Sequence, residues 1–327
     1  MNLPLSTIPA IPLTDLSLPP RGSWPASVHR FDEESAWAVR SALAAQRPLL
    51  VRGEPGSGKS QLARAAAEAL GRLFIAEVVH ARSESQDLQW RFDALGRLGD
   101  AQAMGAHQYG ADEVRQRLDP RNYLSPGALW WVFDWPSALR QQQQSGGRGA
   151  RPQPPAGWSP ARGSVLLIDE IDKAEADLPN GLLETLGNGG FSVHWLDTAV
   201  CAAPAMPTPL VVITTNEERE LPAAFIRRCL VLNLRWPSNE DAFTARLIER
   251  GRLHFHARCH PEVYREAARQ LWQDRQEAAR QGLQGPGQAE YLDLLRVVVS
   301  LAPVIDEQLA LLAKVGEFAL RKHPPAD

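Results

Sequence analysis

Eight consecutive residues in the first part of the chain have the types and spacing of a phosphate-binding loop. They satisfy the pattern G-x-x-x-x-G-K-[ST] and are Gly53, Glu54, Pro55, Gly56, Ser57, Gly58, Lys59 and Ser60. The glycines of this pattern let successive backbone N–H groups turn toward phosphate oxygens. Lys59 can then reach the β- and γ-phosphates of a nucleoside triphosphate, and the Ser60 hydroxyl can ligate Mg²⁺. The pattern predicts that residues 53–60, with Gln61 after them, bind such a nucleotide.

Two adjacent carboxylates form a second group of candidate residues. Asp169 ends the apolar run 165–168, so its carboxylate is expected at the carboxyl edge of a parallel sheet, where it can hold Mg²⁺ directly or through a water. Glu170 is expected on the opposite side of the extended chain, where it can polarise a water for in-line attack on the γ-phosphate. The alternative is that both carboxylates cap a helix beginning near Lys173, since carboxylates favour helix starts.

A polar strand end and an arginine pair are the remaining candidates. Residues 214–216 end a further apolar run, and Asn216 can orient the attacking water. Arg227 and Arg228 are expected on a short helix. Because arginine keeps its proton and matches phosphate geometry, the pair can stabilise the charge of phosphoryl transfer from across a subunit boundary. The alternative is that the two arginines are ordinary solvated surface residues, as an isolated Arg-Arg pair usually is.

These residues require strands and helices that bring them to one place. Apolar runs predict buried strands at residues 48–51, 73–79, 165–168, 210–214 and 230–234. Helical patterns lie between them, which indicates an α/β fold: a P-loop three-layer αβα sandwich with a parallel sheet. The helix predicted directly after Ser60 presents its N-terminal N–H groups and dipole to an anion.

The chain is predicted to have an N-terminal arm and two domains. Residues 1–27 are proline-rich and indicate an extended arm, and residues 28–236 form the α/β domain. Residues 237–327 are expected to form a small all-helical domain. Its first helix is expected to begin with a capping box of Ser238 and Asp241, and further helices are predicted at residues 261–281, 290–301 and 303–321.

The 110 positions from Lys59 to Asp169 are more than the predicted elements need, so we expect insertions near residues 91–123 and 141–163. The first is polar and glycine-containing, as a hairpin or lid would be. The second begins with four glutamines and has the composition of a flexible loop, most simply a tolerated surface insertion. The aromatic run 129–135 between them is expected to pack under the sheet, with a partner surface as the alternative.

Composition narrows the classes of protein to consider. The 327 residues include 35 basic and 38 acidic ones, with a net charge of −3, so no global field attracts nucleic acid or an anionic membrane. Three widely spaced cysteines do not form a disulfide framework. No apolar run approaches the length of a membrane span, and prolines interrupt the N-terminus where a signal peptide would be apolar. We therefore expect a cytoplasmic, soluble protein.

The order of the motifs resembles that of the AAA+ ATPases. It is Walker A at residues 53–60, Walker B at 168–170, sensor 1 at Asn216 and an arginine finger at 224–228. More narrowly, the chain resembles the MoxR-like group, which carries an insertion in its second core helix. The segments that carry this resemblance are 86–88 with Arg91, 125–129, 169–174, 182–186 with Phe191, and 215–222. The resemblance covers roughly residues 28–300.

The resemblance implies a ring, usually a hexamer, with ATP and Mg²⁺ bound between protomers. Lys59, Ser60, Asp169, Glu170 and Asn216 would act from one subunit, while Arg227 or Arg228 reaches in from the next. Members of the group act as chaperone-like remodellers that mature metalloenzymes or other complexes, commonly with a partner bearing a von Willebrand factor A domain. The chain departs from many AAA+ proteins at residues 285–292, where a sensor 2 arginine is missing and Arg296 is the candidate replacement.

Three functions fit these features. The leading hypothesis is ATP hydrolysis coupled to remodelling or maturation of a protein complex. The alternatives are a nucleic-acid-directed motor or restriction-type NTPase subunit, and a nucleotide-gated assembly switch with little turnover. The first insertion has Arg91, Arg97 and His107 against Asp93 and Asp100, which makes nucleic acid an unlikely partner.

Overall fold

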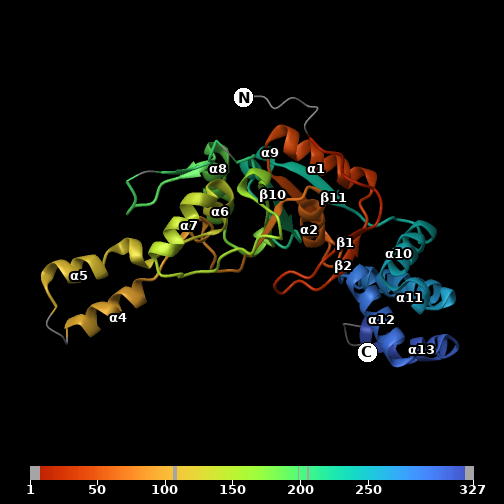
Figure 1. Cartoon of the computed structure of the whole chain (residues 1–327). Helices are drawn as coiled ribbons and strands as arrows, with labels where there is room; N and C mark the ends of the chain where they lie inside the picture. The colour runs from red at the N-terminus through yellow and green to blue at the C-terminus, as the bar shows by residue number, and fades with distance from the viewer. Residues whose placement is uncertain (1–7, 106–108, 198, 205, 321–327) are drawn as a thin grey trace. The chain divides into compact units, whose positions relative to one another are not determined.

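The chain folds into two compact units, each assembled from separate segments (Figure 1). A computed structural model describes residues 8–105, 109–197, 199–204 and 206–320. The first unit consists of Met1–Ile11, Glu33–Val51 and Ala63–Leu232, and the second of Pro12–Asp32, Arg52–Leu62 and Asn233–Asp327. Residues 1–7 of the predicted arm, 106–108 of the first insertion and 321–327 of the helical domain lie outside the described residues. Because both units are discontinuous, the expected domain boundaries stay predictions.

A five-stranded sheet organises the first unit, with the order β11-β3-β10-β7-β4. Its strands are β3 (Leu49–Gly53), β4 (Leu73–Val78), β7 (Ser164–Asp169), β10 (Leu210–Thr215) and β11 (Leu230–Leu234). Strand β7, next to the edge strand β4, pairs in parallel with both β10 and β4. Its apolar residues are fully buried, as expected for a strand covered on both faces by helices. The predicted α/β sandwich with a parallel sheet is therefore confirmed.

Several helices flank the sheet of this unit. They are α1 (Glu33–Ala45), α2 (Lys59–Ala69), α6 (Ala128–Phe133), α7 (Trp135–Gln144), α8 (Asp177–Asn188) and α9 (Ala223–Arg228). The aromatic run forms α6 and the start of α7, and α6 packs against β7 and β4. Trp130 and Trp131 are both buried, and the Trp130 indole donates a hydrogen bond to Ser137 Oγ at 2.8 Å. These rings therefore belong to the core, as the sequence predicted.

The first insertion is a helical hairpin on a two-stranded base (Figure 1, yellow). Strand β5 (Trp90–Phe92) pairs antiparallel with β6 (Leu124–Pro126), and α4 (Ala94–Gly105) and α5 (Ala111–Arg117) lie between them. The short helix α3 (Ser85–Gln89) leads into β5 and packs against α8. Gln89 Nε2 donates to Thr185 Oγ1 of α8 at 2.8 Å. The base of the hairpin is thus joined to α8.

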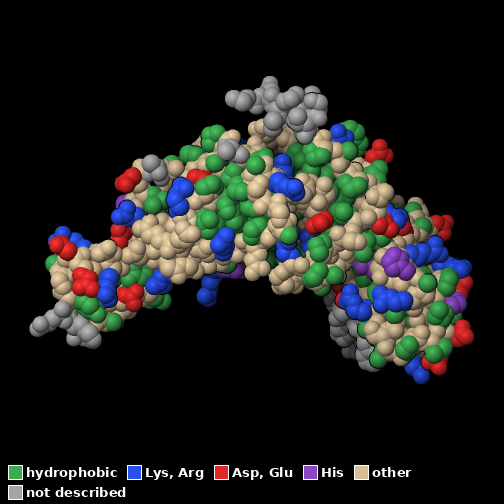
Figure 2. Space-filling view, in the orientation of Figure 1, with side chains coloured by type: hydrophobic (Ala, Val, Ile, Leu, Met, Phe, Trp, Pro, Cys, Tyr) green, Lys and Arg blue, Asp and Glu red, His purple; other side chains and the backbone are tan. Residues whose placement is uncertain are grey.

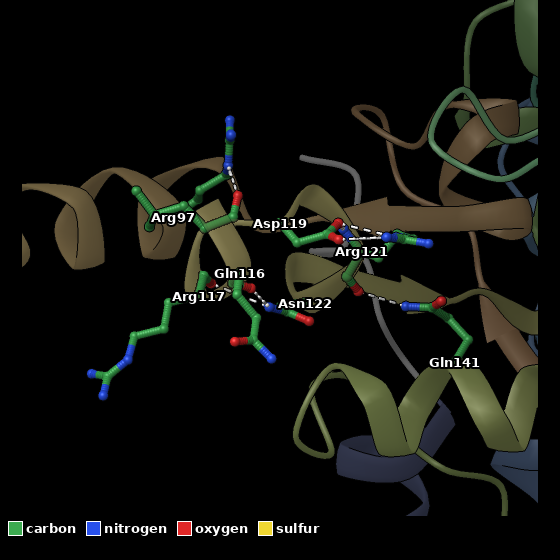
Figure 3. Close-up of polar contacts among 8 residues, drawn as sticks. Arg97, Gln116, Arg117, Asp119, Arg121, Asn122 and Gln141 are labelled. Atoms are coloured by element: carbon green, nitrogen blue, oxygen red, sulfur yellow. Dashed lines mark hydrogen bonds and ion pairs between the residues drawn. The ribbon is translucent and has the colours of Figure 1, made fainter. Parts of the chain in front are cut away.

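The second predicted insertion, a flexible loop at residues 141–163, does not include the four glutamines at its start. For these residues the prediction is wrong. Residues 141–144 form the end of α7, and Gln141 and Gln142 are buried. Gln141 Nε2 donates to the carbonyl oxygen of Arg121 at 2.7 Å (Figure 3). It also donates to that of Leu124 at 2.8 Å. Glutamine is a good helix former, and its amide has two donors for carbonyls at the end of the insertion. The side chain thereby anchors the hairpin.

Four helices build most of the second unit. They are α10 (Glu240–Phe255), α11 (Pro261–Arg280), α12 (Gln288–Leu301) and α13 (Gln308–Leu320), joined by a small hairpin of β1 (Leu16–Leu18) and β2 (Ser27–His29). Their apolar faces meet in one core that includes Phe243, Tyr264, Tyr291 and Leu295. The small all-helical region after the sheet is confirmed. No helix among the described residues is long and apolar enough to cross a membrane.

Two helix starts in this unit differ from the prediction. Asn239, and not Ser238, caps α10, because its Oδ1 accepts the Ala242 N–H at 2.8 Å. The last helix begins at Gln308 and not at Pro303. The Gln308 amide is buried and donates to the carbonyls of Arg258 and Ala302, so this contact fixes where the final helix starts.

We predict that replacing Gln141 by leucine loosens the helical hairpin. Both carbonyls would lose their donor inside the protein, so the free energy of unfolding should fall by about 1–3 kcal/mol. Urea denaturation measures this change, and limited proteolysis should show faster cleavage within residues 91–123. Gln143→Leu, at an exposed position of the same helix, is the control. Equal stability of the two variants would contradict the anchoring role of Gln141.

Candidate functional site

The phosphate loop leaves the end of β3 in a conformation that requires glycine. Gly53 has φ = 156°, and a Cβ atom there would lie 2.8 Å from the carbonyl oxygen of Leu234. Gly58 has φ = 93°, a region that other residues rarely adopt, with open space beside it. Helix α2 begins at Lys59, so its first N–H groups directly follow the loop. The local sequence therefore folds into the loop that the motif predicts.

Lys59 is held inside this loop by backbone oxygens. Its side chain Nζ donates to the carbonyl of Gly53 at 2.6 Å and to that of Glu54 at 2.8 Å, and the residue is only 6% exposed. A buried ammonium needs such partners. Gln61, the next predicted residue, donates through Nε2 to the Val28 carbonyl at 2.9 Å and so ties the start of α2 to β2. The loop and these contacts all belong to the second compact unit.

The carboxylates lie at the ends of strands in the first unit. Asp169 is the last residue of β7, and its Oδ1 accepts a hydrogen bond from the Thr214 hydroxyl at 2.6 Å. The same hydroxyl oxygen accepts the Glu170 N–H at 2.9 Å. Thr214 comes from the neighbouring strand β10 and is fully buried. Its side chain therefore sets the positions of both acidic residues.

Glu170 does not continue the extended chain, and this part of the sequence prediction is wrong. Its backbone is left-handed, with φ = 59° and ψ = 49°, and a single turn of 3-10 helix follows at Ile171–Lys173. The turn redirects the Glu170 carboxylate. Oε1 lies 3.3 Å from Asn216 Nδ2, and Oε2 lies 2.7 Å from Lys173 Nζ. The hydrogen bond and charge of Glu170 raise the pKa of Lys173.

A left-handed conformation at a non-glycine residue costs about 1–3 kcal/mol, so the surrounding contacts must hold it. The hydrogen bond from the Glu170 N–H to Thr214 and the ion pair with Lys173 do so. The alternative reading, in which Asp169 and Glu170 cap a helix starting near Lys173, does not apply: α8 begins only at Asp177, and Glu170 forms no side-chain cap on the short turn.

Asn216 follows β10 and is positioned by an acid to which the sequence analysis gave no role. The Asp172 carboxylate is 1% exposed, and its Oδ2 accepts the N–H groups of Asn216 at 3.1 Å and Glu218 at 2.9 Å. The signal for this residue was a third acid, two positions after Glu170. The structure thus brings Asp169, Glu170 and Asn216 together at the ends of two neighbouring strands.

The arginine pair lies apart from these residues. Both arginines end α9, which is fixed to the core by the buried Phe225. Arg47 donates to the backbone carbonyls of Arg227 and Arg228. Both arginines are exposed, and Arg228 Nη1 donates to the Leu183 carbonyl of α8 at 3.2 Å. In the part of the chain that the structure describes, no hydrogen bond or ion pair joins either arginine to Glu170 or Asn216.

A comparison with protein-family models matches the part of the chain that contains these candidate residues. Residues 48–229 match a family described as AAA domain (dynein-related subfamily). This segment covers more than half of the chain and contains the phosphate loop, the strand-end carboxylates, Asn216 and both arginines. No curated protein matches the chain.

We predict that Thr214→Val disturbs both acidic residues without changing the volume of the core. The Glu170 N–H and Asp169 Oδ1 would each lose a buried partner, so the free energy of unfolding should fall by about 1–3 kcal/mol. ATP turnover should fall by about ten- to a hundredfold, because small displacements of catalytic groups are costly.

Chemical denaturation and a steady-state phosphate-release assay measure the two effects. Thr244→Val is a matched control, because Thr244 is a half-buried helical residue whose hydroxyl donates to the carbonyls of Glu240 and Asp241 in its own helix. If Thr214→Val turned over ATP as fast as this control, the role of the hydroxyl would be refuted.

Proposed function

Because the chain belongs to the AAA domain family, in its dynein-related subfamily, and is therefore an ATPase, we propose that it couples ATP hydrolysis to chaperone-like remodelling or maturation of a protein complex as an oligomeric ring. The observation that carries the hydrolytic part is the approach of Asn216 Nδ2 to Glu170 Oε1 at 3.3 Å, next to Asp169. Such a pair can position a water and accept its proton.

The phosphate loop has the groups that a nucleotide needs. Backbone N–H groups of the loop glycines and of the start of α2 can donate to phosphate oxygens, and Lys59 supplies a positive charge. The Ser57 hydroxyl is buried and has no hydrogen-bond partner among the described residues, which supports a ligand oxygen beside it. We assign ATP binding to residues 53–61 on this basis.

Ser60 and Asp169 each carry an oxygen donor of a kind that Mg²⁺ accepts, a hydroxyl and a carboxylate, and Mg²⁺ often keeps water between itself and the protein. When bound, Mg²⁺ neutralises charge on the β- and γ-phosphates. Asp169 is suited to this task because Thr214 holds its carboxylate at the strand end. Glu170 acts as the general base, and Asn216 holds its carboxylate toward the water.

We assign the arginine that acts on a neighbouring subunit to Arg227. The Arg228 guanidinium donates a hydrogen bond to the Leu183 carbonyl, so this residue is better suited to positioning α9 against α8. Arg227 is exposed at the end of the same helix, whose backbone Arg47 holds in place. A guanidinium presented in this way can stabilise the transferred phosphoryl group across a ring interface.

The helical hairpin supports a protein client over a nucleic acid. Several of its basic side chains already have partners within the unit: Arg117 pairs with Glu113, Arg121 with Asp119, and Arg97 donates to the Leu118 carbonyl. Figure 2 shows acidic and basic groups interspersed over this region. Leu95 of α4 is 82% exposed. Such a surface suits contact with another protein better than tracking of a phosphate backbone.

The MoxR-like assignment rests on the motif resemblance, and the helical insertion between β5 and β6 supports it. A partner bearing a von Willebrand factor A domain is proposed on the resemblance alone. The remaining alternative, a nucleotide-gated assembly switch, differs from the proposal in one measurable respect: its turnover would be negligible even in the unmodified protein.

We predict that Glu170→Gln abolishes hydrolysis while ATP binding persists. Without the carboxylate no group accepts the proton of the attacking water, so turnover should fall by about 10²- to 10⁴-fold. Phosphate release measures turnover, and a fluorescent ATP analogue measures binding. Glu218→Gln, an exposed change in the adjoining loop, is the control. Normal turnover in Glu170→Gln would show that another residue is the base.

We predict that substitutions of Arg227 and Arg228 have different effects on turnover. Mixing two inactive variants then tests whether Arg227 acts across an interface. Arg227→Ala should lose about 10³-fold or more in turnover, whereas Arg228→Ala should mainly lose stability. Lys59→Ala subunits cannot hold the phosphates but still have Arg227. Mixing them with Arg227→Ala subunits should therefore restore part of the activity, since some interfaces would be intact. Absence of recovery would contradict action across an interface.

A further inference from the structure

The phosphate loop carries a carboxylate, which is an unfavourable group beside a triphosphate. Glu54 is the second residue of the loop, and its backbone carbonyl accepts a hydrogen bond from Lys59 Nζ at 2.8 Å. Like charges repel across a few ångströms, most strongly where water is partly excluded. An acidic residue at this position therefore needs a compensating charge if the loop is to bind an anion tightly.

Arg275 of α11 supplies that charge. Its Nη2 donates to Glu54 Oε1 at 3.0 Å, and its Nη1 lies 2.8 Å from Glu54 Oε2, so the ion pair involves both carboxylate oxygens. The Arg275 side chain is 16% exposed, in contrast to the other arginines of the same helix with recorded ion pairs, all of which are at least half exposed. The contact at Oε1 is a charge-assisted hydrogen bond, which is stronger than one between neutral groups, and the contact at Oε2 is an ion pair.

The position of the Arg275 guanidinium is set by the rest of the second unit. It also donates to the Pro286 carbonyl at 2.9 Å, and it lies over the rings of Trp236 at 5.8 Å and Phe243 at 5.6 Å. The turn before α12 touches the loop as well, because a Cβ atom on Gly287 would lie 3.1 Å from the Pro55 carbonyl oxygen. Arg275 is therefore a fixed part of the surroundings of the loop.

Arg296, the candidate replacement for the sensor 2 arginine, has different surroundings from Arg275. It pairs with Asp293 on its own helix, and its side chain is 65% exposed. Of the two arginines, Arg275 is the one that contacts the phosphate loop.

We propose that Arg275 is a positioning residue for ATP: it neutralises Glu54 and holds it in the one place that leaves the phosphate loop able to accept a triphosphate. The inference rests on the proposed function, because it takes residues 53–60 as the ATP site. Loss of Arg275 exposes the nucleotide to the Glu54 charge. The resulting repulsion is greater for a triphosphate than for a diphosphate.

The test is a charge-compensation cycle in the full chain. Arg275→Gln should weaken binding of a fluorescent non-hydrolysable ATP analogue about tenfold, and binding of the matching ADP analogue less. Glu54→Gln combined with Arg275→Gln should return the affinity to within about threefold of the unmodified protein. Because the effect is electrostatic, raising the salt concentration should reduce the loss in Arg275→Gln.

Arg280→Gln is the matched control, since Arg280 lies on the same helix and pairs with neighbouring Glu277 at the surface. A purely structural role for Arg275 would weaken both analogues equally, and Glu54→Gln would not restore binding. Either result overturns the proposal. So does unchanged affinity in Arg275→Gln.

Glu54→Gln alone is a second test, which leaves Arg275 intact and applies even if Arg275→Gln does not fold. It should bind the ATP analogue at least as tightly as the unmodified protein, and a tenfold loss would refute the compensation. Lys59→Ala separates this inference from the proposed function. If Lys59→Ala abolishes binding while the Arg275 variants do not alter it, ATP still binds at the loop and only the role of Arg275 is wrong.

Discussion

The hydroxyl of Thr214 is the contact on which the arrangement of the acidic residues depends. It donates to Asp169 and accepts from the Glu170 backbone, so one buried side chain joins the ends of two parallel strands. Without it the left-handed turn at Glu170 would lack a partner for its N–H group. The distance between Glu170 and Asn216 follows from this turn and from Asp172, which holds the backbone of the neighbouring strand end.

The strands and the phosphate loop could be predicted from the sequence because their signals are local. A continuous apolar run such as residues 165–168 indicates a strand buried on both faces, and the glycine spacing at residues 53–58 indicates the turn. The turn at Glu170 and the role of Asp172 were not predictable in this way. Each depends on partners 44 to 46 residues away in sequence, and no periodic pattern marks such a pairing.

Long-range contacts also explain the other places where the structure differs from the sequence-based predictions. The glutamines at residues 141–144 have the composition of a loop, yet two carbonyls of the insertion provide partners that make Gln141 a buried helical residue. Arg275 and Glu54 are 221 residues apart, and either one alone looks like an ordinary surface charge. The helical unit and the phosphate loop thus depend on each other in a way that composition does not reveal.

The contact between α3 and α8 has a mechanical consequence. Helix α8 begins seven residues after Glu170, and Gln89 and Thr185 join it to α3, which runs directly into β5 of the hairpin base. The fit is tight, since a Cβ atom on Gly181 would lie 2.4 Å from Ser85 Oγ. Close-packed interiors transmit displacement and do not absorb it. A displacement of α8, which follows Glu170 in the chain, would therefore be carried through α3 to the base of the hairpin.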